Sequence, residues 1–149
     1  MKISSAVQTD QANTKVLASL TLAQAALESD WGRSQLAAKW NNYFGVKTST
    51  DDEDKFVLLP TKEYLDGKWV TIKDKFAVYK TPLESIEAHS KLFLEGTTWN
   101  KDQYVDVINA KNYKDAAIGL VKDGYATDPQ YAEKIISVIE KYHFNIYDK

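Results

Sequence analysis

Residues 21–34, TLAQAALESDWGRS, hold the pattern that decides the fold. Thr21 and Gln24 have the spacing of a capping box, in which each side chain bonds the backbone amide of the other residue. This spacing predicts a helix that starts near Leu22. Apart from Gln24 and Glu28 the helix has no polar face, so we expect it to be buried on nearly all sides.

Helical patterns continue on both sides of this stretch. Loosely helical spacing over residues 3–15 predicts an exposed helix, and a short helix is expected over residues 34–40. Turn-forming residues follow at 41–45, and residues 49–55 form a polar, acidic loop. Three further helices are expected at 81–94, at about 112–123 with Gly124 as its stop, and from 128 onward.

The period changes from helical to alternating between residues 61 and 73. Asp66 and Gly67 favour a type I′ turn, and the register that this turn imposes sets Tyr64 opposite Trp69. Glu63 then lies on the other face, with the apolar residues Leu65, Val70 and Ile72. The pattern as a whole predicts a single domain over residues 1–149 with an α+β, mostly α fold, in which a small β-hairpin is inserted between helices.

Composition excludes several classes of function. The chain has 149 residues, a net charge of −2 and no cysteine, so it can bury a core but offers neither thiolate metal ligands nor a basic surface for nucleic acid. The longest uncharged run, residues 16–27, is too short and too polar to span a membrane. The first residues lack the apolar run of a secretory signal. We expect neither nucleic acid nor a membrane as a partner.

Glu28 is the most informative titratable residue. It is the only charge between Lys15 and Asp30 and closes an apolar helix. If the surroundings exclude water, the pKa of its carboxyl rises. A carboxyl that stays protonated can act as a general acid and donate its proton to a glycosidic oxygen. The alternative is an ordinary glutamate at a helix end that faces solvent or pairs with Arg33.

Other titratable residues give weaker signals. Glu63 either lines a cleft or is an exposed charge on an edge strand. His89 and His143 lack the spacing of metal ligands, and His89 is expected to be a hydrogen-bonded structural residue. We therefore expect no metal, and since no glycine-rich phosphate cradle occurs, we expect no nucleotide cofactor.

Four separated segments resemble one enzyme family. Residues 23–34, 41–47, 61–64 and 125–132 occur in the order found in glycoside hydrolase family 73, the bacterial and phage peptidoglycan N-acetylglucosaminidases. The resemblance runs from about residue 17 to 142. It implies a lysozyme-like helical lobe with a small β-lobe over a groove. It also implies endo-hydrolysis of the β-1,4 bond between N-acetylglucosamine and N-acetylmuramic acid in peptidoglycan.

The resemblance also implies a set of site residues. Glu28 matches the general acid, Glu63 a second carboxylate of the β-lobe, and Tyr125 an active-site tyrosine. The implied substrate-binding residues are Trp31, Asn42, Phe44 and Asp128. The second step stays open between a base-activated water and the substrate's own 2-acetamido group. Two rival functions are a lytic transglycosylase, which makes an anhydro product, and a non-catalytic glycan-binding module.

The sequence departs from the family pattern at two places. Asp30 stands where glycine is common, and Ala77 replaces a frequent arginine, which puts only a peripheral contact in doubt. The resemblance implies a monomer without cofactor that acts on glycan strands outside the cell, at the cell wall or as part of a phage particle.

Overall fold

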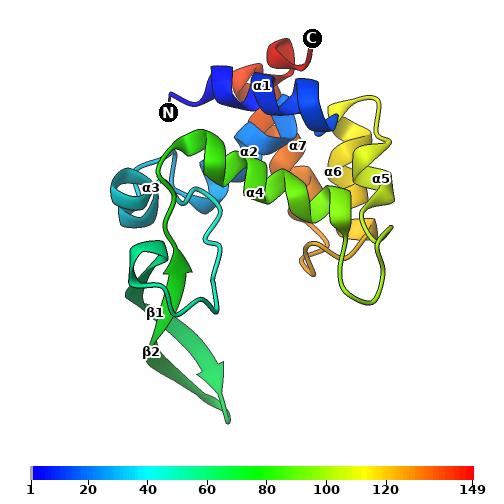
Figure 1. Cartoon of the computed structure of the whole chain (residues 1–149). Coiled ribbons are helices and arrows are strands. Elements are labelled where there is room, and N and C mark those ends of the chain that lie inside the picture. The colour runs from blue at the N-terminus through cyan, green and yellow to red at the C-terminus, as the bar shows by residue number, and fades with distance from the viewer. Residues whose placement is uncertain (1) are drawn as a thin grey trace.

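The protein is described by a computed structural model that covers residues 2–149. Within this range a two-stranded sheet is inserted among α-helices, which confirms the predicted fold class (Figure 1). The α-helices are α1 (Ser4–Thr14), α2 (Ala18–Glu28), α3 (Gln35–Trp40), α4 (Pro82–Glu95), α5 (Val105–Ile108), α6 (Tyr113–Lys122) and α7 (Tyr131–Tyr142). The strands are β1 (Phe56–Leu65) and β2 (Lys68–Ala77). Two short 3-10 helices are η1 (Glu53–Lys55) and η2 (Phe144–Asp148).

Helix α2 forms the centre of the helical lobe. It packs against α1, α6, α7 and η2, and Ala18–Ala26 are all buried. Leu20 faces the part of the core that contains Ile135, whereas Leu22 faces the part that contains Val7. The expectation of a helix buried on nearly all sides is therefore confirmed.

The start of α2 differs from the prediction. The helix begins at Ala18, and the Thr21 hydroxyl lies inside it, donating to the carbonyl of Leu17 at 3.4 Å. The first amides are capped by distant side chains instead. Gln11 Oε1 accepts from the Ala18 amide at 2.7 Å, and Asp148 Oδ1 accepts from the Ser19 amide at 2.7 Å. Caps supplied by tertiary structure leave no local pattern in the sequence, so the capping box was wrong.

Helix α1 is also less exposed than expected. Ile3 and Val7 are buried against the second core cluster, and Asp10 is buried between α1 and α4. The Asp10 carboxylate accepts from the Ser90 hydroxyl and, at 3.3 Å, from that of Thr14. Paired polar groups let a mostly polar helix bury one face, which the search for an apolar stripe does not detect.

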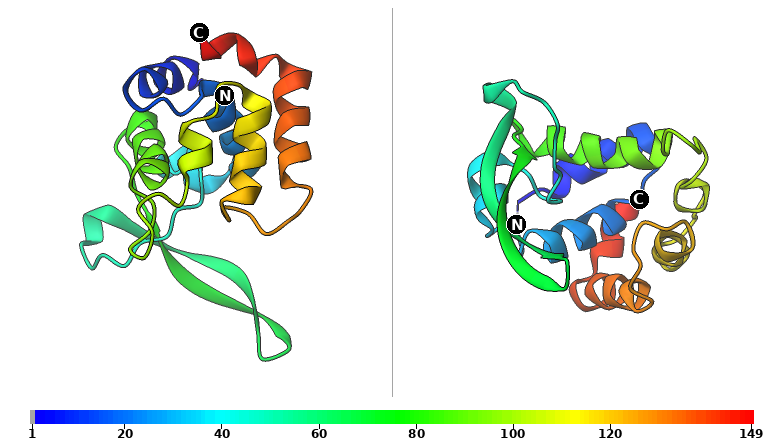
Figure 2. Two further views of the ribbon diagram at one scale, coloured as in Figure 1. Left: turned by 90° about the vertical axis from the view of Figure 1, so that its right-hand side faces the viewer. Right: turned by 90° about the horizontal axis from the view of Figure 1, so that it is seen from below.

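The hairpin has the predicted register. Tyr64 pairs with Trp69 and Glu63 with Val70, while Asp66 and Gly67 have φ values of 51° and 79°, as a type I′ turn requires. Both strands are longer than expected. The hairpin projects from the helical lobe and is tied to it at its base, where the Ala77 amide donates to the Val46 carbonyl at 2.9 Å (Figures 1 and 2).

The remaining helices agree with the prediction except at some boundaries. Thr81 caps α4 and Asn112 caps α6, and Gly124 follows α6 with a φ of 85°. Helix α7 begins at Tyr131 rather than at residue 128, and the short α5 was not predicted. Over residues 2–149, no helix combines the length and the apolar character that a membrane crossing demands.

Candidate active site

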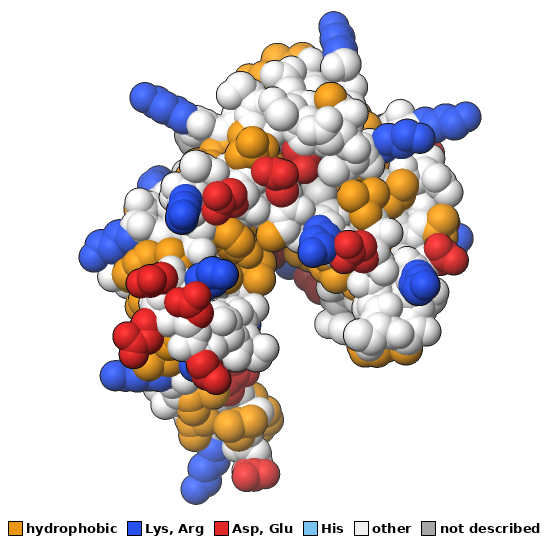
Figure 3. Space-filling view, viewed as in Figure 1, with side chains coloured by type: hydrophobic (Ala, Val, Ile, Leu, Met, Phe, Trp, Pro, Cys, Tyr) orange, Lys and Arg blue, Asp and Glu red, His pale blue; other side chains and the backbone are white. Residues whose placement is uncertain are grey.

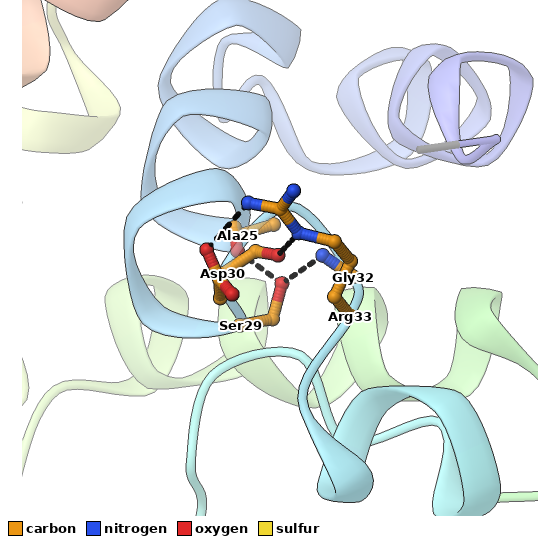
Figure 4. A network of polar contacts seen from close by, with 5 residues as sticks. All are labelled: Ala25, Ser29, Asp30, Gly32 and Arg33. Atoms are coloured by element: carbon orange, nitrogen blue, oxygen red, sulfur yellow. Dashed lines mark hydrogen bonds and ion pairs between the residues drawn. The ribbon is translucent and has the colours of Figure 1, made fainter.

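Glu28 is the last residue of α2, and a tight turn fixes the chain that leaves it. The Ser29 hydroxyl donates to the Ala25 carbonyl and accepts from the Gly32 amide at 2.8 Å (Figure 4). Arg33 binds the Asp30 carboxylate at 2.8 Å and its carbonyl at 3.0 Å. Because Arg33 is paired with Asp30, the alternative in which it neutralises Glu28 is wrong, whereas the alternative of a glutamate that faces solvent agrees with the exposed position of Glu28.

The Glu28 carboxyl lies in an environment that disfavours its charge. Its side chain remains open to solvent, yet the surrounding protein atoms displace enough water to raise the pKa of the carboxyl. No hydrogen bond or ion pair from another residue in the range 2–149 is among the causes of the shift. The position at the negative end of a helix dipole acts in the same direction. A proton can therefore stay on Glu28 at a pH where an ordinary glutamate has lost it.

Two tyrosines lie within electrostatic range of Glu28. Burial raises the pKa of Tyr125, and burial raises that of Tyr131 to about 12, with the Glu28 charge adding to both shifts. The Tyr131 hydroxyl accepts from Gln24 Nε2 at 3.2 Å, one helical turn before Glu28. Glu28 and Tyr125 are thus close enough for their charges to interact, while their catalytic roles stay predictions. The structure adds Gln24 and Tyr131, which stand in the matching segments but were interpreted only as helix residues.

Tyr125 packs against a cluster of aromatic rings. The His89 ring lies 3.9 Å from that of Phe44, nearly parallel to it, and meets Phe93 and Tyr125 edge-on. His89 is buried, and desolvation lowers its pKa to about 3, so the ring is neutral. Within residues 2–149 neither ring nitrogen has a hydrogen-bond partner. His89 is structural, but the expected hydrogen bonds are wrong.

Asn42 and Phe44 require a correction. Asn42 is 1% exposed, and its amide donates to the carbonyls of Val46 at 3.0 Å and Ala77 at 2.9 Å while accepting from the Val46 amide. Phe44 is 8% exposed and stacked on His89. Both side chains are committed to internal contacts, so the expected direct substrate contacts are wrong. They hold the loop after α3 to the base of the hairpin and to the cluster of aromatic rings.

Glu63 lies on the half-buried face of the hairpin. Its carboxylate binds Lys47 Nζ at 3.0 Å, and the same ammonium binds Asp74 at 2.9 Å. Lys47 comes from the loop before the hairpin and was not predicted, because its partners are distant in the sequence. No contact joins Glu63 to Glu28 among the hydrogen bonds and ion pairs of residues 2–149, and its catalytic role stays a prediction.

Two further predicted residues have clear structural contacts. The Trp31 ring is half-buried, 4.5 Å from the ring of Tyr142 and 5.9 Å from that of Phe144. Asp128 accepts from the Gln130 amide at 2.9 Å and pairs with Lys134 at 2.7 Å at the start of α7. Their substrate contacts stay predictions.

The surface between the two lobes is concave. Figure 3 shows it hollowed between the hairpin limb and the part of the helical lobe that carries α5 and α6. The loop between α6 and α7, which contains Tyr125, lies at the end of the helical lobe from which the hairpin projects (Figures 1 and 2). Over residues 2–149, no three His, Asp or Glu side chains are grouped as a metal site requires.

Comparison with known proteins decides the family. The sequence model of the glucosaminidase family, described as mannosyl-glycoprotein endo-beta-N-acetylglucosaminidase, matches residues 4–144. The chain belongs to this family. Membership confirms the resemblance seen in the sequence and classes the chain as a hydrolase of glycosidic bonds.

Individual glucosaminidase relatives agree with this assignment. The chain is 52% identical over 134 residues to the exo-glucosaminidase LytG of Bacillus subtilis, covering 90% of this chain and 47% of the relative. It is 36% identical over 133 residues to a probable N-acetylmuramidase of Lactococcus lactis, covering 87% of this chain and 30% of the relative. The chain thus spans half or less of the length of these relatives.

A solved structure supports the lysozyme-like arrangement of the glucosaminidase fold. The catalytic domain of the autolysin Auto from Listeria monocytogenes superposes with a TM-score of 0.90 at 39% identity. The match covers 98% of this chain and 83% of the Auto domain. Both lobes of the present structure therefore have a counterpart in a known catalytic domain.

Proposed function

We propose that the chain hydrolyses the β-1,4 bond between N-acetylglucosamine and N-acetylmuramic acid in peptidoglycan, with Glu28 as the general acid. The observation that carries the proposal is the Glu28 carboxyl, which has a raised pKa, has no ion-pair partner within residues 2–149 and lies within electrostatic range of Tyr125. A proton on this carboxyl can pass to the glycosidic oxygen as the bond breaks, because a general acid must be protonated at the working pH.

Tyr125 and Glu63 have different roles in this proposal. The raised pKa of Tyr125 keeps its hydroxyl protonated, so it donates a hydrogen bond to the sugar beside the breaking bond. Glu63 is the second carboxylate and activates the attacking water. The ion pair with Lys47 holds the Glu63 carboxylate in place. The alternative in which the substrate's 2-acetamido group attacks requires no base at Glu63, and the Glu63→Ala variant described below distinguishes the two.

The names of the relatives differ on which bond is cut and where along the strand. Glucosaminidase and muramidase names both occur, and LytG is named an exo-enzyme. We propose the glucosaminidase bond, in line with the family description and the most similar of these relatives. We propose internal cleavage, in line with the endo-beta-N-acetylglucosaminidase description of the family.

Analysis of the products from purified peptidoglycan tests this function. Reduction of the digest followed by mass spectrometry identifies the new end of each fragment. Reduced N-acetylglucosamine ends support the proposal, and reduced muramic acid ends indicate a muramidase. Anhydro-muramic ends indicate a transglycosylase, and the absence of new ends indicates a binding module. A rapid fall in strand length indicates internal cleavage, whereas slow release from the ends indicates an exo-enzyme like LytG.

The setting of the reaction is part of the proposal. We infer that the chain acts as one catalytic domain, as a monomer, on glycan strands of the cell wall outside the cytoplasm. The autolysin name of one solved relative supports the cell wall as the site of action. Light scattering during turnover measures the oligomeric state, and a dimer as the active species contradicts the monomer.

A further inference from the structure

The two faces of the hairpin differ in charge. The register places Glu63 and Asp74, the only acidic residues of the two strands, on the face that also bears Lys47's ion pairs. The opposite face carries three lysines and no acid. We call its outer part the basic face; its residues are Lys62, Tyr64, Trp69, Thr71 and Lys73.

Two of the three lysines are unpaired. Lys75, near the base of the hairpin, binds Asp51 at 2.6 Å and lies over the Phe56 ring. Lys62 and Lys73 have no ion-pair partner within residues 2–149. Since Lys62 lies opposite Thr71, Lys73 is its diagonal neighbour, and such neighbours lie about 7 to 8 Å apart.

Exposed aromatic rings adjoin these charges. The rings of Tyr64 and Trp69 are 5.3 Å apart and are 60% and 71% exposed. A concavity of about 550 Å³ adjoins this face; it is lined by Lys62, Trp69 and Thr71 of the basic face and by Val70, whose side chain belongs to the opposite face. The basic face therefore combines two free ammonium groups, two aromatic surfaces and a concavity, and none of these is used by the site around Glu28.

We propose that the basic face binds the carboxylate-bearing peptide stems of peptidoglycan. The hairpin then holds the wall, while the concave surface between the two lobes holds the strand to be cut. This inference rests on the proposed function. The carboxylates of the peptide stems are separate from one another, and each can bind one of the two separate ammonium groups, those of Lys62 and Lys73. Phosphates are better matched by bidentate arginine, and the only arginine of the chain is paired with Asp30. The aromatic rings offer apolar surface to the methyl groups of alanine-containing stems.

A binding experiment with charge variants tests the proposal. The variants are Lys62→Glu/Lys73→Glu and, with the charge retained, Lys62→Arg/Lys73→Arg. Lys15→Glu/Lys111→Glu is the matched control, since it makes the same change of net charge at exposed positions outside the hairpin. Each is sedimented in the cold with purified peptidoglycan from which phosphate polymers have been extracted by acid, and with the same material after an amidase has removed the peptides.

The expected result is roughly ten-fold weaker binding for the hairpin glutamate variant at low salt, with a smaller difference at high salt. The arginine variant and the control bind like the wild type, and removal of the peptides reduces wild-type binding to the level of the glutamate variant. Equal binding of all variants overturns the proposal, as does binding that requires the phosphate polymers or persists without peptides.

Release of new sugar ends by the wild type is measured in the same samples after warming. If the wild type releases none, the proposed hydrolysis fails. If it releases them and the glutamate variant still binds normally, only the inference about the basic face fails. The two failures are therefore separate.

Discussion

At the scale of single residues, Glu28 is the group on which the proposed chemistry depends. We expect Glu28→Gln to lower hydrolysis of peptidoglycan by about 10² to 10⁴-fold, because the amide cannot donate the proton that the leaving oxygen needs. The fold should persist, since the carboxyl has no hydrogen-bond or ion-pair partner to lose within residues 2–149. Counting new reducing ends measures activity, and thermal unfolding followed by circular dichroism serves as the control. A variant with near-normal turnover removes Glu28 from the mechanism.

The pH profile of hydrolysis follows from the same residue. Desolvation raises the pKa of Glu28, so the active, protonated form persists above the range of an ordinary glutamate. Activity should fall as the pH rises through this raised pKa, because the acid then loses its proton. The dependence of kcat/KM on pH in the free enzyme measures it. A falling limb at an ordinary glutamate value contradicts the role of desolvation.

The lowered pKa of His89 predicts how the free energy of unfolding depends on pH. The folded state holds this ring neutral with a pKa of about 3, whereas the unfolded chain protonates it below about 6.5. The unfolded state therefore binds more protons between these values, and stability is lost as the pH falls. We expect His89→Phe, which keeps the stack on Phe44, to lose about 2 kcal/mol less free energy of unfolding than the wild type between about pH 7 and about pH 5. Urea unfolding at both pH values checks this, and parallel losses count against it.

At the scale of elements, the hairpin and α2 show what local sequence can predict. The two residues Asp66 and Gly67 fix a turn, and the turn fixes every later pair of the ladder, so the register followed from the sequence. The burial of α2 followed from its composition. Its start did not, because the groups that cap it come from Gln11 and from Asp148. Local patterns report local hydrogen bonds, and tertiary caps fall outside them.

The distant cap of α2 can be tested directly. Asp148 accepts from both the amide and the hydroxyl of Ser19, at 2.7 and 2.6 Å. We expect Asp148→Ala to lower the free energy of unfolding by about 1 to 2 kcal/mol, which is typical of a lost helix cap. Urea unfolding provides the measurement, and Asp102→Ala provides the control, since Asp102 is exposed and its carboxylate has no hydrogen-bond or ion-pair partner within residues 2–149. Equal stability of the Asp148 variant and the wild type shows that the cap contributes nothing.

At the scale of the whole molecule, the candidate site depends on two lobes that the sequence alone cannot position. Residues near Glu28 could be named from sequence segments, and Tyr125 lies within range of it. Asn42 and Phe44 belong to the same segments, yet they are buried supports. A family motif combines residues that touch substrate with residues that position them, and only burial separates the two groups.

Variants of Glu63 and Trp69 test what the two faces of the hairpin contribute to hydrolysis and to stability. Glu63→Ala should reduce turnover with little loss of stability, because within residues 2–149 the half-exposed Lys47 is the only ion-pair partner of its carboxylate. Trp69→Ala should leave the bond cleavage step unchanged and cost at most about 1 kcal/mol, since the ring is largely exposed and contributes mainly through its contact with Tyr64. Turnover and unfolding are measured for both variants. Normal turnover in Glu63→Ala favours attack by the substrate's 2-acetamido group.

The bond between Ser19 and Asp148 also orders events during synthesis. The two residues are 129 positions apart, so at roughly 5 to 20 residues per second a ribosome needs roughly 6 to 26 seconds to pass from one to the other. Throughout that interval the helix that carries Glu28 lacks the side chain that caps its first turn. A nascent chain therefore acquires the finished support of its proposed acid only after position 148 has left the ribosome.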